Sequence, residues 1–337
     1  MKKQIVNPTF ARLIKQVWRL VIASLLFILA ACSPASNTPT QLPTAQIQLS
    51  TSIAPTSTEA FSTSQTRTEI ETNTVVEGDS ISSIALAFGL QPETVLWANY
   101  DLLLDDPDYL LPGMQLTILP VDGVYHQAGG GDSVQSLAAF FAADAQAIVD
   151  WPGNQIDSAD PQLFVGQWVL IPGGSRGLRR RFLPNLPRYA MAVDPIEYGV
   201  GACPENVSID VAGDGNYSWP VDDPNVRGDG FWSAHPGLDL SVAVDGKVRA
   251  ADVGVVVFSG WSNFGYGNTI MLDHGNGDFT LYAGLSTVIA NCGSLVQKGE
   301  VIATGGMSGH PAEPFVHFEI RRGEDFLVPS QVMQSEN

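Results

Sequence analysis

The chain has 337 residues, of which 45% are hydrophobic, so it is too long for one ordinary domain and apolar enough for packed cores. We therefore expect two or three modules. It carries 35 acidic and 17 basic residues, a formal net charge of −18, which excludes the electrostatic attraction on which nucleic-acid binding depends.

The first thirty residues are basic and then apolar. Five lysines and arginines without an acid precede an apolar run from Val21 to Ala31, which ends in small residues before Cys32. This is the pattern of an export signal, and the run is shorter than the roughly 20 residues of a spanning helix. We predict that residues 1–31 are a processed signal peptide. Its removal leaves 12 basic against 35 acidic residues, a net charge near −23.

Leu29-Ala30-Ala31-Cys32 resembles the bacterial lipobox, in which the cysteine is acylated and becomes the first residue of the mature chain. The resemblance implies that Cys32 anchors the protein by lipid to the outer face of the cell membrane, facing the cell wall. An ordinary signal peptide with a chance cysteine is the alternative. The remainder of residues 32–72 is rich in Ser, Thr and Pro, which predicts a flexible stalk.

An internal repeat follows the stalk. Gly78-Asp79-Ser80 recurs as Gly131-Asp132-Ser133, and further residues recur at the same offset of 53. A constant offset across a whole unit indicates duplicated modules. In the first unit the patterns predict, in chain order, a strand at Thr74–Val76, a helix at Ile81–Phe88, a short helix at Val95–Ala98 and a strand at Gln115–Leu119.

This β-α-α-β order resembles the LysM module, an α+β fold that binds N-acetylglucosamine-containing glycans such as peptidoglycan. The resemblance covers residues 73–120, with Asn99 and Leu111-Pro112-Gly113 in place, and a divergent second module at 121–173. There Trp151-Pro152 interrupts the second helix, so this module has either a glycan-binding or a structural role.

By the same resemblance, glycan contacts fall on Asp79, Ser80 and Ile81, in the turn before the first helix. Neither module contains a Lys or Arg, so binding depends on neutral hydrogen bonds and apolar contacts. The alternative is that Asp79 and Ser80 only cap the helix.

Residues 174–215 contain many Pro and Arg and are interpreted as a linker. Their basic cluster, Arg176 and Arg179–Arg181, is interpreted as solvated chain rather than a docking patch. In an oxidising exported setting the two remaining cysteines, Cys203 and Cys292, favour one disulfide, and two unpaired buried thiols are the alternative.

Residues 216–329 alternate in short strands broken by Gly and Asn, which predicts an all-β domain, followed by a tail at 330–337. His235-Pro-Gly-Leu-Asp239 sets two ligand-type side chains four residues apart, and His317 lies in a predicted strand. Zinc is commonly held by three such nitrogen and oxygen groups. A His and Asp that only hydrogen-bond each other are the alternative.

The motifs around this set resemble the lysostaphin or LytM type of zinc metallopeptidase domain. They are, in order, Gly265-Tyr266-Gly267-Asn268, His274-Gly275, Leu281-Tyr282-Ala283 and His317-Phe318-Glu319. The resemblance implies that His235, Asp239 and His317 hold one zinc ion and that His274 is structural.

Two positions depart from the family pattern. Where the family has Tyr-x-His-Leu this chain has Tyr282-Ala283-Gly284-Leu285, and where it has HxH this chain has Phe315-Val316-His317. In active members both absent histidines assist the attack of water on a peptide carbonyl, and such a general acid or base contributes roughly 10²- to 10⁴-fold. No catalytic residue is therefore assigned, unless His310 or Glu313 replaces them.

The sequence thus favours a multidomain, peptidoglycan-binding lipoprotein that acts as a wall binder or regulator. Its expected partners are peptidoglycan glycan and stem peptides, the membrane through Cys32, and a cell-wall amidase, but not nucleic acid. The alternative is an active zinc endopeptidase that cleaves peptidoglycan peptides. A third reading is a stalk-borne adhesin whose groove has no function.

Overall fold

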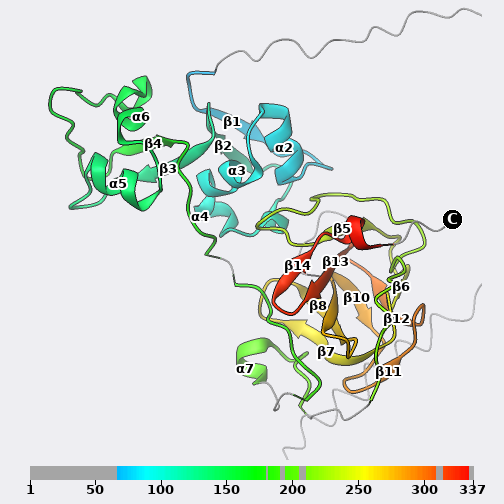
Figure 1. Cartoon of the computed structure of the whole chain (residues 1–337). Helices are drawn as coiled ribbons and strands as arrows, with labels where there is room; N and C mark the ends of the chain where they lie inside the picture. The colour runs from blue at the N-terminus through cyan, green and yellow to red at the C-terminus, as the bar shows by residue number, and fades with distance from the viewer. Residues whose placement is uncertain (1–66, 180, 190–193, 205–209, 309–313, 334–337) are drawn as a thin grey trace, which may run out of the picture. The chain divides into compact units, whose positions relative to one another are not determined.

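The computed structural model describes residues 67–179, 181–189, 194–204, 210–308 and 314–333 (Figure 1). These residues belong to one compact unit, Ser62–Asn337. The predicted signal peptide, Cys32, nearly all of the stalk, His310 and Glu313 lie outside the described residues. Within the described ranges, no helix combines the length and the hydropathy needed to cross a membrane.

The first module has the predicted order of strand, helix, helix and strand. Its elements are β1 (Glu71–Thr74), α2 (Ile81–Phe88), α3 (Pro92–Ala98), α4 (Tyr100–Leu103), the 3-10 helix η2 (Pro107–Tyr109) and β2 (Gln115–Ile118). β1 pairs antiparallel with β2. The observed first strand ends at Thr74, whereas the predicted one spans Thr74–Val76, because Val75 is outside the regular β1–β2 pairing. Its N–H donates to Met114 O at 2.8 Å, and its side chain is buried in the module core.

A second module repeats this order. Its elements are β3 (Gly123–Gln127), α5 (Val134–Phe140), α6 (Ala145–Asp150), η3 (Pro152–Asn154) and β4 (Trp168–Pro172), with β3 antiparallel to β4. Helix α6 ends where Trp151-Pro152 predicts an interruption, because proline lacks the N–H that would continue the helix.

The hydrogen bonds of the two modules also repeat. Ser80 and Ser133 each form a capping box at the start of α2 and α5. Asn99 bridges α3 to β2 through both Thr117 backbone groups, and Asn154 makes the same pair of bonds to Leu170. The sequence comparison missed Asn154 because its offset from Asn99 differs from the constant offset of the repeat.

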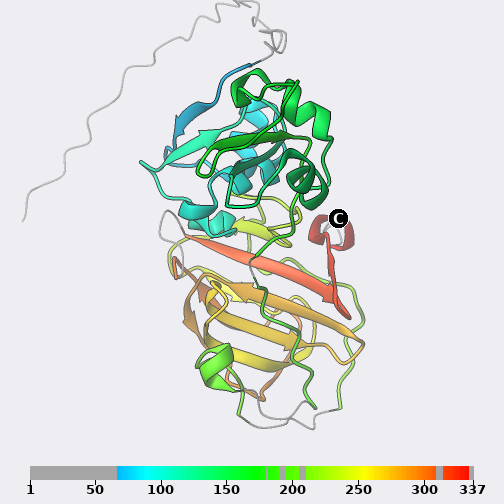
Figure 2. The ribbon, with the colours of Figure 1, turned by 90° about the vertical axis from the view of Figure 1, so that its left-hand side faces the viewer.

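The C-terminal domain consists of two antiparallel sheets. Its strands are β5 (Leu238–Ser241), β6 (Lys247–Arg249), β7 (Gly254–Ser262), β8 (Gly267–Asp273), β9 (Asp278–Ala283), β10 (Leu285–Val288), β11 (Leu295–Val296), β12 (Val301–Gly305), β13 (Phe315–Arg322) and β14 (Asp325–Leu327), before the short helix α8 (Pro329–Val332). The larger sheet runs β11-β7-β8-β9-β13-β14 with β5 also on β13, and the smaller runs β10-β12-β6. Figure 2 shows the long strands of the larger sheet side by side.

Both faces of the larger sheet are buried. Ile270 and Leu272 pack with Val248 and Ile302 of the smaller sheet in one core. Met271, between them, faces the opposite side, because successive side chains of a strand alternate.

That opposite face is covered by part of the predicted linker. Leu183 and Leu186 are buried against it, and a short helix α7 (Pro195–Tyr198) follows.

The Arg176 guanidinium binds both oxygens of the fully buried Asp105, at 2.8 and 2.6 Å. The interpretation of Arg176 as solvated chain is therefore wrong. Its burial was not predictable because few apolar residues in this segment indicate it.

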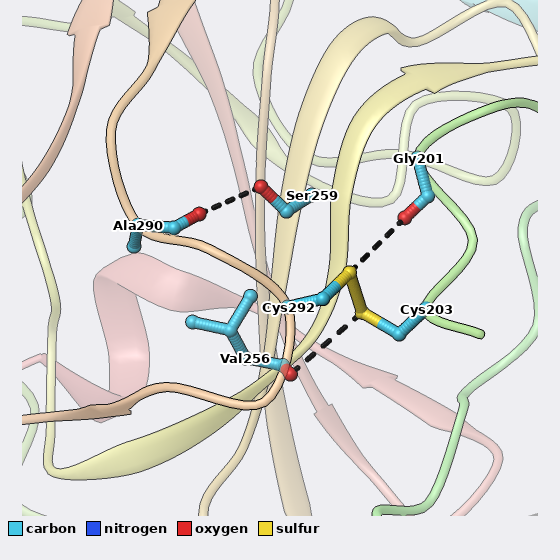
Figure 3. The surroundings of a disulfide bond; sticks show 6 residues. All are labelled: Gly201, Cys203, Val256, Ser259, Ala290 and Cys292. Atoms are coloured by element: carbon cyan, nitrogen blue, oxygen red, sulfur yellow. Dashed lines mark hydrogen bonds between the residues drawn. A yellow bond between two sulfur atoms is a disulfide. The ribbon is translucent and has the colours of Figure 1, made fainter. Parts of the chain in front are cut away.

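A disulfide joins this covering segment to the turn between β10 and β11. Cys203 and Cys292 are bonded, with Cα atoms 5.4 Å apart and a sequence separation of 89 (Figure 3). We expect Cys203→Ser/Cys292→Ser to lower the free energy of unfolding by about 2–5 kcal/mol, because the unfolded chain gains freedom. Urea unfolding with and without reductant measures this. The double variant should not respond to reductant, and a wild-type protein equally insensitive to it would contradict the prediction.

Candidate metal centre

His235, Asp239 and His317 meet at one place on the larger sheet. Asp239 on β5 lies directly opposite His317 on β13 in the antiparallel register. His235 ends a tight turn that begins at Trp232. The backbone N–H of each of these two residues donates to the carbonyl oxygen of the other. Gly237 is needed between them, since a Cβ there would lie 2.7 Å from Cε1 of His317.

The three side chains converge to contact distance. His235 Nε2 lies 3.1 Å from Asp239 Oδ1, and His317 Nδ1 lies 3.0 Å from the same oxygen and 3.0 Å from His235 Nε2. All three residues are buried. Ligand atoms around a tetrahedral zinc ion with bonds of about 2.0–2.1 Å are roughly 3.3 Å apart, so the spacing fits one ion.

The outer hydrogen bonds of the two imidazoles fix their tautomers. His235 Nδ1 lies 2.8 Å from Gly230 O, and a carbonyl only accepts, so Nδ1 carries the proton. His317 Nε2 lies 3.1 Å from Glu319 Oε1. In the neutral imidazoles the unprotonated nitrogens therefore face each other, an arrangement that a cation between them stabilises.

Glu319 is ionised in this setting. Burial raises its pKa, but Arg321 and His317 outweigh burial and hold the pKa at about 2. Arg321 Nε donates to Glu319 Oε2 at 2.6 Å, and the Tyr266 hydroxyl donates to Oε1 at 2.8 Å. The carboxylate thus accepts the Nε2–H of His317 and orients its Nδ1 toward the cluster.

The electrostatics of the cluster also favour a cation. Burial lowers the pKa of His235, but the carboxylates of Asp239 and Asp108 outweigh burial and raise the pKa well above its ordinary value. A positive charge at His235 Nε2 is therefore stabilised, whether a proton or a metal ion supplies it. The donor set of imidazoles and carboxylates suits zinc.

A fourth side chain reaches the cluster. Asp108, in η2 of the first module, places Oδ1 3.4 Å from His235 Nε2. One ligand atom from each of Asp108, His235, Asp239 and His317 lies within 4.8 Å of every other. Asp108 was not predictable as a ligand, since it belongs to a different module and to no metal motif.

The two departures from the family pattern are neighbours in space. Gly284 has a positive φ of 72°, and a Cβ there would lie 3.5 Å from Cε2 of Phe315. Phenylalanine and glycine thus occupy adjoining positions beside the cluster.

His274 lies outside the cluster. Its Nδ1 donates to Val253 O at 2.7 Å, and burial lowers its pKa, as suits a structural side chain.

The predicted glycan turn is partly corrected. The Ile81 side chain is fully buried in the core of the first module, so it is not available to a glycan. Ser80 accepts from Ser83 N–H as the cap of α2, and Asp79 accepts from Val76 N–H at 2.9 Å. The capping alternative therefore describes Ser80, while Asp79 closes the turn.

The C-terminal domain is thus a two-sheet β domain with buried His, Asp and His side chains that are able to hold a metal ion. Residues 233–329 match peptidase family M23, and residues 74–119 match the LysM domain. The chain thus contains a LysM domain, the first module, followed by an M23 peptidase domain.

Curated proteins match parts of this chain. DD-carboxypeptidase/endopeptidase Mpg of Neisseria meningitidis serogroup B is 41% identical over 90 residues, 27% of this chain and 20% of that protein. Murein hydrolase activator EnvC of Escherichia coli is 32% identical over 122 residues, 34% and 28% of the two chains. The matches thus span less than a third of either relative. The solved structure of lysostaphin from Staphylococcus simulans is 26% identical, with a TM-score of 0.32 over 36% of this chain and 54% of that chain.

Proposed function

We propose that this protein is an exported envelope lipoprotein that binds peptidoglycan and regulates its hydrolysis rather than cutting it. One observation carries the proposal. His235, Asp239 and His317 converge as a metal site would require, while Gly284 and Phe315 replace the two imidazoles beside them. Among the described residues, the domain keeps side chains that can hold a metal, while Gly284 and Phe315 stand where the family pattern has proton-transferring histidines.

Zinc at this site would supply Lewis-acid polarisation of a peptide carbonyl. The protein's own residues then do the rest. Glu319 orients His317, Gly230 orients His235 through its carbonyl, and neither Gly284 nor Phe315 can accept or donate a proton. Without a general base, which typically contributes roughly 10²- to 10⁴-fold, we expect hydrolysis near background.

The rest of the chain supports a wall-facing role. The LysM domain suits peptidoglycan glycan, and we propose that residues 121–173 are a divergent second copy. Cys32 is the proposed lipid anchor. The similarity to a protein named murein hydrolase activator supports a cell-wall amidase as partner.

An active zinc endopeptidase is the second candidate. It is favoured by the retention of all three ligand side chains and by the similarity to a protein named DD-carboxypeptidase/endopeptidase. A pure binding domain has no chemical need for a metal, although bound metal also stabilises a fold.

Metal analysis combined with a sacculus assay separates the two. We expect the purified protein to contain about one zinc ion per chain and to release no new amines from peptidoglycan sacculi. Robust hydrolysis that His235→Ala abolishes would reject the regulator and establish the endopeptidase. Absence of zinc at neutral pH would reject the metal site.

A further inference from the structure

Asp108 is held in place by its own loop. Pro107 is buried, and the Asp108 N–H donates to Asp106 Oδ1 at 3.2 Å, so the short helix η2 is capped. The Asp108 side chain is only 8% exposed and points its carboxylate at His235. Its approach to the cluster is therefore part of an ordered, buried contact.

Other contacts at the same place hold the first module against the M23 domain. Asp229 Oδ1 accepts from Ser82 N–H, in the first turn of α2, at 2.8 Å, and Ser233 Oγ donates to Glu93 Oε1 at 2.6 Å. Ala234, the neighbour of His235, is fully buried in the core of the first module. The residues that lead into the metal cluster are thus also the residues that bind this module.

The glycan turn of the first module faces this contact. Asp79 and Ser80 line a cavity of about 90 Å³ together with Asp108, Asp239 and Phe315. Pockets for drug-sized ligands span roughly 300–1,000 Å³, so this cavity is too small to enclose an oligosaccharide. A glycan that reached Asp79 inside the cavity would need the two surfaces to separate.

The charges at the cluster relate the position of Asp108 to metal binding. Asp108 and Asp239 bring two carboxylates to a buried site beside two imidazoles, and a divalent cation at their centre would neutralise both carboxylates. Buried carboxylates without such a partner are costly. Four protein ligands also close the coordination of zinc, as in structural sites, whereas catalytic sites keep one position open.

We propose that Asp108 is the fourth ligand of the metal, so that the ion clamps the LysM domain onto the M23 domain beside the Asp79 turn, which we also propose as the glycan contact. Glycan binding at Asp79 and the closed clamp then exclude each other. Peptidoglycan glycan then separates the LysM domain from the metal cluster, and metal holds the two together in the absence of glycan. This inference rests on the metal site of the proposed function.

Two titrations of the full chain, purified in detergent, test the clamp. The first measures zinc affinity by competition with a chromophoric chelator. We expect Asp108→Ala to weaken it by at least the roughly 10- to 100-fold that loss of an outer-shell partner causes. Asp101→Ala, which removes an exposed carboxylate of the same module, is the matched control and should leave it unchanged.

The second titration measures binding of the N-acetylglucosamine tetramer by calorimetry with and without zinc. We expect zinc to weaken tetramer binding by a factor within the roughly 5- to 150-fold range of typical couplings. The tetramer must weaken zinc binding by the same factor, because linkage is reciprocal. In Asp108→Ala this factor should fall to about one.

Each outcome decides a different part of the proposal. Wild-type protein that binds no zinc would overturn both the metal site and the clamp. Zinc bound equally well by wild type and Asp108→Ala would overturn the clamp alone. Tetramer affinity that zinc does not change, or no tetramer binding by the metal-free protein, would overturn the competition with glycan.

Discussion

His317→Ala is expected to reduce bound zinc from about one ion per chain to almost none. His317 Nδ1 lies 3.0 Å from both Asp239 Oδ1 and His235 Nε2, so it forms one side of the cluster. Its loss leaves Asp239 and Asp108 with a single imidazole. The stability that metal adds should disappear with it, about 4 kcal/mol for an ion present at 1,000 times its Kd.

Metal analysis after dialysis and thermal unfolding with and without EDTA measure this effect. EDTA should lower the unfolding temperature of the wild type and leave that of His317→Ala unchanged. His126→Ala is the matched control, because it removes an imidazole of the second module that pairs with Asp132. A variant lacking His317 that still retains zinc would contradict the assignment.

The parts of the fold and site with local determinants are predictable from the sequence. The spacing of His235 and Asp239 places them on one turn and strand, and the strand that carries His317 pairs directly with that of Asp239. The helices of both modules likewise follow from apolar periodicity and the Ser80 and Ser133 caps.

Burial that depends on contacts distant in sequence is not predictable in this way. Leu183 and Leu186 occur among Pro and Arg and look like linker residues, yet they cover one face of the larger sheet. In the sequence Asp108 is one of several acidic residues in its loop, and only the fold brings it to His235. None of these three residues has a local pattern that distinguishes it from solvent-exposed chain.

Restoring both absent histidines is expected to restore hydrolysis only if Asp108 is also removed. A Cβ at position 284 would lie 3.4 Å from Phe315 O and 3.5 Å from the phenyl ring, both ordinary contacts, so an imidazole can be built there. Histidine tolerates the left-handed backbone of Gly284 better than most residues, at a cost of about 1–3 kcal/mol. Phe315→His replaces the adjoining ring by a smaller one.

We expect Gly284→His/Phe315→His/Asp108→Ala to release amines from sacculi at least about 10²-fold faster than wild type, the lower end of what a positioned acid or base contributes. Gly284→His/Phe315→His with Asp108 retained should remain near background, because the fourth position stays closed. Adding His317→Ala to the triple variant should abolish the gain. Hydrolysis by the double variant would mean that Asp108 does not close the site. A folded, zinc-loaded triple variant without activity would mean that hydrolysis requires further groups besides the two restored imidazoles.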